Sequence, residues 1–372
     1  MKKIQMVDVV SQYEKHADVI NEKILNVIKS GCYIQGLEVE NFENELSNYL
    51  NSKYTISCAN GTDALYVALM SLDFNVGDEI LVPSFTFVST VETICLLGLK
   101  PVFIDIHPDT FLLNESLIKN LISNRTRAII PVHLFGQCCD MSHLKKVSKK
   151  YNLFIIEDAA QSIGSQYFFN NSNAKFSGTI GDIGITSFYP SKNLGCFGDG
   201  GAIFTQSKKL SNKIRLLVNH GQHKKYHYDI IGLNSRLDAI QASVLSFKLK
   251  HLAQFNRQRQ DAAVYYDDLL KNIDWIKIPK RQPSSNHVYH QYSILLSDDI
   301  KRDTFQKYLS NQGIPTMIYY PIPIHKQRAY SVYSKNKLPV SEMVSKKILS
   351  LPMHSELTRE QQDYIFNTIK KY

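Results

Sequence analysis

Residues 182–201 of the sequence read DIGITSFYPSKNLGCFGDGG. The first part, residues 183–188, is rich in β-branched and aromatic side chains and predicts a strand that is buried on both faces. The second part is rich in serine and glycine, and a single lysine, Lys192, lies within it. A lysine in such a turn is usually just solvated, so its meaning depends on what the rest of the chain places beside it.

Segments of similar character recur on both sides of this stretch. We expect strands at residues 54–59, 79–83, 101–106, 127–132, 153–158 and 201–205. Helical segments fall between most of them, at residues 62–72, 89–97, 116–122 and 141–150. This alternation predicts an α/β fold with a mostly parallel seven-stranded sheet flanked by helices.

The pattern changes after residue 205. Longer helices are expected at 237–252 and 257–270, followed by a loop rich in proline and serine, a strand at 290–296, and helices at 301–312 and 359–370. We therefore expect a large domain of residues 1–245 and a smaller C-terminal α/β domain of residues 246–372.

Composition narrows the class of protein. The chain has 372 residues, 44% of them hydrophobic, and six cysteines without a C-x-x-C pattern, so we expect free thiols and no metal site. No apolar run is long enough for a membrane span, and the start does not resemble a secretory signal, which predicts a cytoplasmic protein without a membrane partner. The net charge of +9 suits an anionic partner, but the scattered lysines disfavour nucleic acid.

Ligands of open α/β sheets bind at the carboxyl ends of the strands. After residue 59, a Gly-Thr turn opens a helix whose free amides suit a phosphate, although an ordinary cap by Asn60 or Thr62 explains it too. Asp158 follows a buried strand and calls for a cationic partner such as a protonated pyridine, or else caps the next segment. Phe87 stacks on a flat ring or packs in the core.

These features, together with Lys192, are the set that pyridoxal 5′-phosphate requires. Its aldehyde forms a Schiff base with a lysine, and its protonated ring is an electron sink that a carboxylate stabilises. The sequence therefore favours this cofactor.

Six ordered motifs carry a resemblance to a known family. They are Asn60-Gly-Thr-Asp-Ala-Leu, Pro83-Ser-Phe-Thr-Phe, Glu157-Asp-Ala-Ala-Gln-Ser, Ser187-Phe-Tyr-Pro-Ser-Lys-Asn-Leu-Gly, Gly198-Asp-Gly-Gly and Gly232-Leu-Asn-Ser-Arg-Leu-Asp-Ala-Ile-Gln-Ala. Over nearly its whole length the chain resembles the DegT/StrS-type sugar aminotransferases, which are fold-type-I pyridoxal-phosphate enzymes acting on nucleotide-linked keto-sugars.

The resemblance implies a role for each matching residue. Lys192 is the Schiff-base lysine and proton shuttle, and Asp158 pairs with the pyridine nitrogen. The other implied cofactor contacts are Gln161 at the ring hydroxyl, Phe87 on the ring, the amides of Thr62 and Asp63 and the hydroxyl of Ser187 at the phosphate, and Asn234 at the phosphate of the partner subunit. The implied assembly is a homodimer with shared sites, and the implied amino donor is glutamate.

Residues 219–234 resemble the corresponding segment of the subgroup that aminates carbon 3 of dTDP-3-keto-6-deoxyhexoses. The enzymes of this subgroup make amino sugars for surface glycans such as lipopolysaccharide O-antigen, or for antibiotics. By this resemblance Lys225 pairs with a pyrophosphate and Tyr226 packs on the sugar, although a solvated loop explains both. Further expected substrate contacts are Tyr189, Tyr320 and His325, the last of which is alternatively a packing residue.

Three other functions remain open at this stage. A sugar dehydratase on the same scaffold has histidine in place of the lysine, so Lys192 argues against it. Amination at carbon 4 of a dTDP- or UDP-linked sugar is the main alternative. A non-enzymatic regulatory protein that binds the cofactor or a sugar is disfavoured by the combination of Lys192, Asp158 and Gln161.

Overall fold

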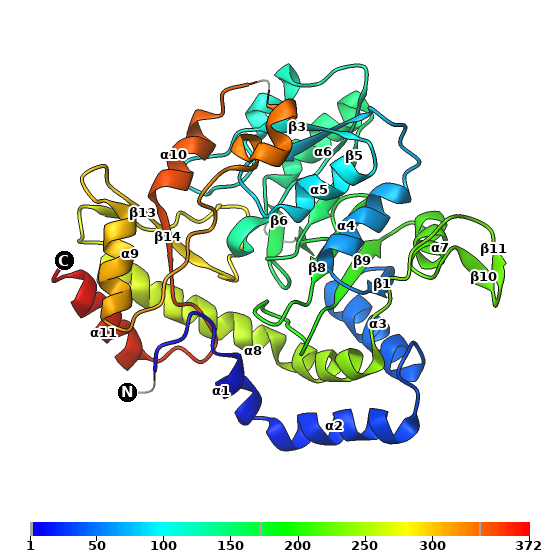
Figure 1. Ribbon diagram of the computed structural model, residues 1–372, viewed down its shortest axis with the longest axis horizontal. Coiled ribbons are helices and arrows are strands. Elements are labelled where there is room, and N and C mark those ends of the chain that lie inside the picture. The colour runs from blue at the N-terminus through cyan, green and yellow to red at the C-terminus, as the bar shows by residue number, and fades with distance from the viewer. Residues whose placement is uncertain (1–2, 171–172, 335) are drawn as a thin grey trace.

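The computed structural model describes residues 3–170, 173–334 and 336–372. Seven strands form its central sheet in the order β1-β9-β8-β5-β4-β2-β3 (Figure 1). In that order they are β1 (Tyr54–Cys58), β9 (Gly201–Thr205), β8 (Ile183–Ser187), β5 (Phe154–Asp158), β4 (Thr126–Ile129), β2 (Glu79–Pro83) and β3 (Lys100–Ile104). Only β9 runs against its neighbours, so the prediction of a mostly parallel sheet is confirmed.

Helices cover both faces of this sheet. One face packs on α4 (Gly61–Met70), α5 (Ser89–Leu96) and α7 (Lys208–Leu217). The other packs on α3 (Leu37–Leu50), α6 (Met141–Tyr151) and the first half of α8 (Ala239–Leu270). Side chains of a strand alternate between the faces, so Ile156 joins the first core and Ile155 the second. Burial on both faces explains why the strands are continuously apolar.

A smaller sheet lies in the C-terminal part of the chain. It is antiparallel and contains β12 (Ile276–Lys277), β13 (Tyr292–Leu296) and β14 (Ile348–Leu351). Its core includes residues of α9 (Arg302–Asn311), of α11 (Arg359–Ile369) and of the second half of α8. Thus α8 connects the two cores, and Figure 1 shows it crossing the lower part of the molecule above α2.

The remaining elements are short or peripheral. They are α1 (Val9–Glu14), α2 (Ala17–Ser30), α10 (Pro339–Lys347), the hairpins β6 (Gln166–Asn170)–β7 (Asn173–Phe176) and β10 (Gln222–Lys224)–β11 (His227–Tyr228), and the 3₁₀ turns η1 (Glu115–Asn120), η2 (Leu134–Gly136), η3 (Ile324–Lys326) and η4 (Arg328–Tyr333). Within the described ranges, no helix has both the length and the apolar character of a membrane span.

Two expectations about helices were wrong. The helices expected at 237–252 and 257–270 are one continuous helix, α8, because residues 253–256 contain no glycine or proline and bury Phe255 and Asn256. The helix expected at 116–122 is the 3₁₀ turn η1. The predicted domain boundary at residue 245 falls inside α8, and the division into two domains stays a prediction.

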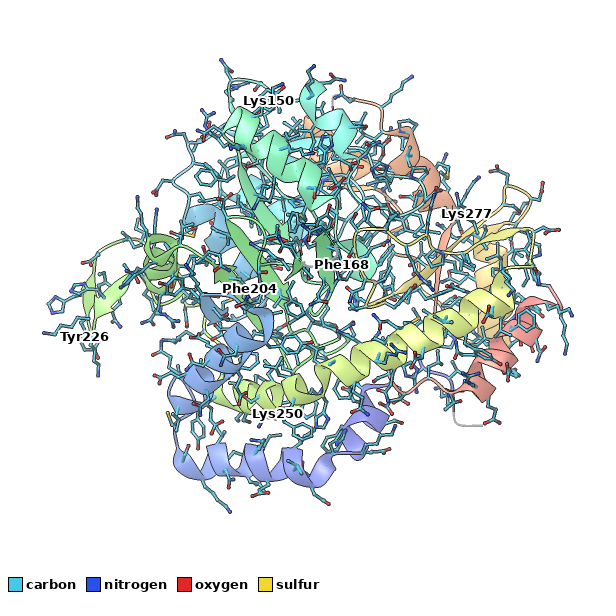
Figure 2. The ribbon with its side chains drawn as sticks, turned by 180° about the vertical axis from the view of Figure 1, so that it is seen from behind. Lys150, Phe168, Phe204, Tyr226, Lys250 and Lys277 are labelled. Carbon is cyan, nitrogen blue, oxygen red and sulfur yellow. The ribbon has the colours of Figure 1, made fainter. Side chains whose placement is uncertain are left out.

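The β10–β11 hairpin stands out from the body of the molecule. Figure 1 shows it beyond α7, and Figure 2 shows Tyr226 at its outer end. The side chain of Tyr226 is 74% exposed, and Tyr228 and Ile231 on the same segment are also exposed. Large apolar side chains on a protruding segment suit an interface with another molecule.

Candidate active site

A cavity of about 790 Å³ lies at the carboxyl ends of the parallel strands. Its walls include residues that follow or end β1, β2, β5 and β8, the place where an open α/β sheet binds its ligand. Nine of the predicted site residues line it, namely Thr62, Asp63, Phe87, Asp158, Gln161, Ser187, Tyr189, Lys192 and Tyr320. The fold therefore brings the expected cofactor groups together.

Asp158 ends β5 and is 5% exposed. Its Oδ2 accepts a hydrogen bond from Thr90 Oγ1 at 2.8 Å, and its Oδ1 accepts one from the amide of Ala160 at 3.1 Å. Burial raises the pKa of Asp158, while these hydrogen bonds and the charge of Lys192 oppose the rise. A buried carboxylate with donors on both oxygens is suited to pair with a protonated ring nitrogen.

The adjacent carboxylate, Glu157, has a different task. Its Oε2 pairs with His133 Nε2 at 2.8 Å, and three backbone amides of the turn at residues 178–181 donate to its two oxygens. Successive strand residues point to opposite faces, so Glu157 turns away from the cavity that Asp158 lines. Glu157 therefore fixes the turn before β8, and Asp158 is the carboxylate that remains for a ligand.

Lys192 lies in the loop after β8, with its side chain half-buried in the cavity wall. Burial lowers the pKa of Lys192 to about 8, and the charge of Asp158 opposes this effect. Lys248 also has a pKa of about 8 because it is buried. However, Lys248 Nζ donates to the carbonyl of Gly195 at 2.8 Å and does not line the cavity. Position, rather than pKa, distinguishes Lys192.

The first turn of α4 supplies donors for an anion. The first amides of a helix have no acceptor within it. Asn60 caps this helix, and its Oδ1 accepts from the Asp63 amide at 2.8 Å, so the Asp63 amide predicted for the phosphate is already bonded. Gly61 and Thr62 belong to the same first turn of α4, where backbone amides have no acceptor within the helix. A Cβ on Gly61 would lie 2.7 Å from Ser187 Cβ, so glycine lets the Ser187 hydroxyl approach this turn closely.

The ring-binding part of the cavity is partly preformed. Phe87 is 53% exposed although it belongs to the cavity wall, so an aromatic face is open for stacking. Gln161 Oε1 accepts from the Phe135 amide at 2.9 Å, and Gln161 Nε2 donates to Tyr320 Oη at 3.1 Å. These two bonds fix the amide at the cavity edge. Anion donors, an open aromatic face, a buried carboxylate and an amine of lowered pKa fit pyridoxal phosphate.

Four predicted residues lie outside this cavity. Lys225 and Tyr226 belong to the protruding hairpin segment, and Asn234 is exposed at the end of the segment that follows it. His325 is 1% exposed, its Nε2 pairs with Glu342 at 3.2 Å, and burial lowers its pKa. Within one chain, His325 packs in the core instead of lining the cavity, and the substrate roles of all four residues stay predictions.

Sequence reasoning missed several residues that line the cavity or hold its side chains. Thr90 holds Asp158, and Ser89 lines the cavity while its hydroxyl lies 2.7 Å from Thr62 Oγ1. Both belong to α5, and a search for polar residues at helix starts after each strand would have found them. His290 and Gln291 also line the cavity, but they directly precede β13 of the smaller sheet. No local motif indicated that this segment reaches the site.

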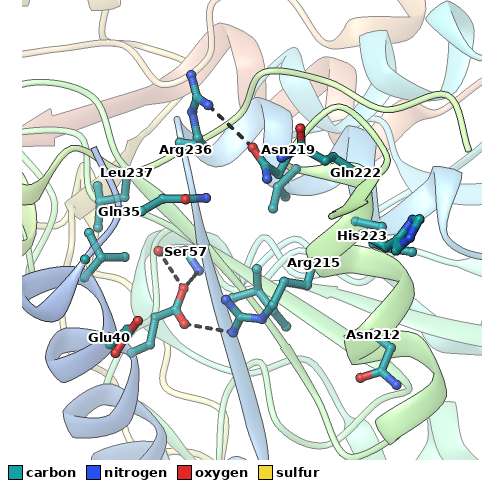
Figure 3. Close-up of a pocket in the computed structure, with 16 residues that line it drawn as sticks. Gln35, Glu40, Ser57, Asn212, Arg215, Asn219, Gln222, His223, Arg236 and Leu237 are labelled. Carbon is teal, nitrogen blue, oxygen red and sulfur yellow. Dashed lines mark hydrogen bonds and ion pairs between the residues drawn. The ribbon is translucent and has the colours of Figure 1, made fainter. Parts of the chain in front are cut away.

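A second pocket of about 550 Å³ lies between α3, β1 and α7 (Figure 3). Arg215 pairs there with Glu43 at 2.8 Å, and Glu43 also accepts from the amide and hydroxyl of Ser57. Arg236 reaches Asn219 Oδ1 at 3.4 Å. Among the residues that the structure describes, no lysine lines this pocket, so it does not offer the amine chemistry of the first cavity. Arg236 is two residues from Asn234, which places the pocket beside the segment predicted to meet a partner.

The fold and the groups at its strand ends define the class of this protein, which is an aminotransferase that depends on pyridoxal phosphate. The family model for the DegT/DnrJ/EryC1/StrS aminotransferase family matches residues 14–370. The chain belongs to that family.

Three relatives match almost from end to end. A UDP-2-acetamido-2-deoxy-3-oxo-D-glucuronate aminotransferase of Pseudomonas aeruginosa is 42% identical, with 95% of this chain and 96% of the relative covered. A dTDP-3-amino-3,6-dideoxy-alpha-D-galactopyranose transaminase of Aneurinibacillus thermoaerophilus is 40% identical, with 97% and 96% covered. A pleiotropic regulatory protein of Geobacillus stearothermophilus is also 40% identical, with 99% and 98% covered.

A solved structure agrees in both fold and cofactor. The protein ntda of Bacillus subtilis was determined with bound cofactor PMP. It superimposes on this chain with a TM-score of 0.90 at 30% sequence identity, covering 100% of this chain and 85% of that one. PMP is the amine form of pyridoxal phosphate, which an aminotransferase forms in the course of its reaction.

Proposed function

We propose that this protein transfers an amino group from an amino acid, L-glutamate, to a nucleotide-linked keto-sugar. The observation that carries the proposal is the meeting of Lys192 and Asp158 in one cavity beside the anion-binding turn of α4. When bound, the cofactor supplies an electron sink for a carbon next to nitrogen. Asp158 keeps the ring nitrogen protonated, and the Lys192 amine moves protons at the substrate carbon.

We propose carbon 3 of a hexose as the site of amination. The two transaminase relatives described above carry names that refer to position 3, on a UDP-linked sugar in one case and a dTDP-linked sugar in the other. The resemblance of residues 219–234 favours dTDP-3-keto-6-deoxyhexose, with a UDP-linked 3-keto sugar and amination at carbon 4 as the alternatives. The product would serve surface-glycan or antibiotic-sugar synthesis.

A panel of keto-sugar nucleotides tests this proposal. The purified enzyme with cofactor and L-glutamate is incubated with 3-keto and 4-keto sugars linked to dTDP or UDP, and the amine position is read by NMR. We expect an amine at carbon 3 and an equimolar amount of 2-oxoglutarate. An amine at carbon 4 would overturn the assignment of position. Absence of turnover with every sugar would overturn the function.

A regulatory role is the second candidate, because one relative carries a regulatory name. This chain has the lysine, the buried carboxylate and the glutamine in one cavity, a combination that binding without turnover does not require. The same incubation separates the two candidates. A regulator would bind cofactor or sugar and form no 2-oxoglutarate, whereas the enzyme forms it in proportion to time.

We further propose a homodimer in which Asn234 completes the phosphate site of the partner subunit. Asn234 is exposed and does not line the cavity of its own chain. Exposed apolar side chains at Tyr226, Tyr228 and Ile231 lie on the segment that leads to it. A two-fold assembly would cover these side chains and place each hairpin segment at the other subunit's site.

Mixed dimers test whether the site is shared. A Lys192→Ala chain is combined with an Asn234→Ala chain under conditions that exchange subunits. One site of each mixed dimer then has Lys192 of one chain and the intact Asn234 of its partner, so we expect activity to rise above the sum of the two parents. If native mass spectrometry shows mixed dimers and activity stays at that sum, Asn234 acts within its own chain.

A further inference from the structure

His290 and Gln291 form an unexplained polar wall of the active-site cavity. They precede β13 and line the cavity, and their side chains are 5% and 4% exposed. His290 Nδ1 and Gln291 Oε1 are buried without a hydrogen-bond partner among the residues that the structure describes. A buried polar atom without a partner destabilises a fold, so two neighbouring ones in a cavity wall point to a ligand that pairs with them.

The backbone holds this wall in a defined place. The Gln291 amide donates to the carbonyl of Phe135 at 3.4 Å. A Cβ on Gly136 would lie 2.8 Å from the amide nitrogen of Tyr289 and 3.0 Å from that of His290, so only glycine permits this approach. This backbone contact places the two residues beside Phe135, whose backbone amide donates to the proposed cofactor contact Gln161.

Both side chains are neutral. Burial lowers the pKa of His290 well below its ordinary value, and the charges of Lys192 and Arg259 lower it further. Arg259 Nη1 donates to the carbonyls of Tyr289 and His290 at 3.1 and 3.4 Å, so the cation remains beside this segment. A neutral imidazole offers one donor and one acceptor, and a primary amide offers donors and an acceptor.

An aminotransferase admits two substrates in turn, an amino acid and the sugar. Carboxylates of the amino acid call for cations, and Lys192 is the only lysine or arginine among the described residues that line the cavity. Hydroxyl groups both donate and accept, which matches His290 and Gln291. Building on the proposed function, we infer that His290 and Gln291 bind ring hydroxyls of the hexose and favour the sugar over the amino acid.

The two half-reactions separate these substrates. The aldehyde form of the cofactor-loaded enzyme is mixed with L-glutamate, or with the amino-sugar nucleotide that the wild type accepts, and its absorbance is followed. In His290→Leu/Gln291→Leu we expect the half-saturating concentration of the amino-sugar nucleotide to rise about 30-fold, from the loss of two hydrogen bonds. The value for L-glutamate should change by less than about threefold.

The matched control is His354→Leu, because His354 is likewise a buried histidine whose pKa burial lowers, it is 3% exposed, and it is not among the described residues that line the cavity. The control should leave both half-reactions unchanged, and all variants should bind dTDP or UDP like the wild type. Equal losses with both substrates, or no loss with the sugar, would overturn the inference alone. A wild type that responds to no amino-sugar nucleotide would overturn the proposed function itself.

Discussion

Replacing Lys192 with alanine is expected to lower kcat by more than about 10⁴-fold. No other lysine or arginine among the described residues lines the cavity, so no side chain nearby replaces the amine. The variant should keep its fold, because Lys192 lies in a loop and its amine is costly to bury in the charged form. Steady-state turnover with L-glutamate and the keto-sugar, with a circular dichroism spectrum of the variant, measures both expectations.

Lys248 is the internal control for this prediction, because burial lowers the pKa of both lysines to about 8. Borohydride reduction of the cofactor-loaded protein, followed by peptide mapping, should place the label on Lys192 and leave Lys248 unlabelled. Lys248 donates to Gly195 and lies over the ring of Phe197, away from the cavity. Label on Lys248 or on a surface lysine would contradict the assigned role.

The lowered pKa of Lys192 also predicts a pH dependence in the cofactor-free protein. With a pKa of about 8, the neutral fraction of the amine rises about tenfold between pH 7 and pH 9, and the rate of cofactor capture should rise with it. The free energy of unfolding should also rise with pH. Between about pH 8 and the ordinary value of 10.5, the unfolded chain binds more protons, so the destabilising effect of Lys192 is present below this window and disappears as pH rises through it.

The large sheet and the positions of the two predicted catalytic residues, Asp158 and Lys192, could be predicted from the sequence for one physical reason. Strands buried on both faces must be continuously apolar, so they can be read without knowing their neighbours. Parallel strands end at one edge, which brings Asp158, Phe87 and Lys192 together although 105 positions separate the outer two (192 − 87). The meeting of these three residues thus follows from local patterns and a single rule of topology, whereas the role of each was implied by the family resemblance.

The parts that could not be predicted depend on contacts between distant segments. Whether His325 faces a ligand or the core depends on its contacts with Glu342 and Phe103. No sequence motif links His325 to either residue. The arrival of His290 and Gln291 at the cavity depends on how closely Gly136 lets their backbone approach. The continuity of α8 depends on burial of Phe255 and Asn256, because local propensity only weakly determines where a helix ends.

Replacing Asp158 with asparagine is expected to lower kcat/KM by about 100-fold or more, because a neutral amide no longer stabilises a protonated ring nitrogen. The geometry of the site should survive. An asparagine oxygen still accepts from the Ala160 amide, and the Thr90 hydroxyl can turn to accept from the new amide. The loss therefore reports the missing charge rather than a displaced side chain.

Unlike activity, the stability of the Asp158→Asn protein should not fall. Burial raises the pKa of Asp158 above its ordinary value of 3.8, so ionising it costs the folded chain free energy that the unfolded chain does not spend. That penalty is absent below pH 3.8 and develops as pH rises through the raised folded value, so at neutral pH the cofactor-free Asp158→Asn protein should melt no lower than the wild type.

Thr90→Val is the matched control for activity, because it keeps the carboxylate and removes only the 2.8 Å hydrogen bond to Oδ2. It should lose about tenfold in kcat/KM. An Asp158→Asn enzyme that is as active as Thr90→Val would show that the carboxylate charge is not the source of the effect.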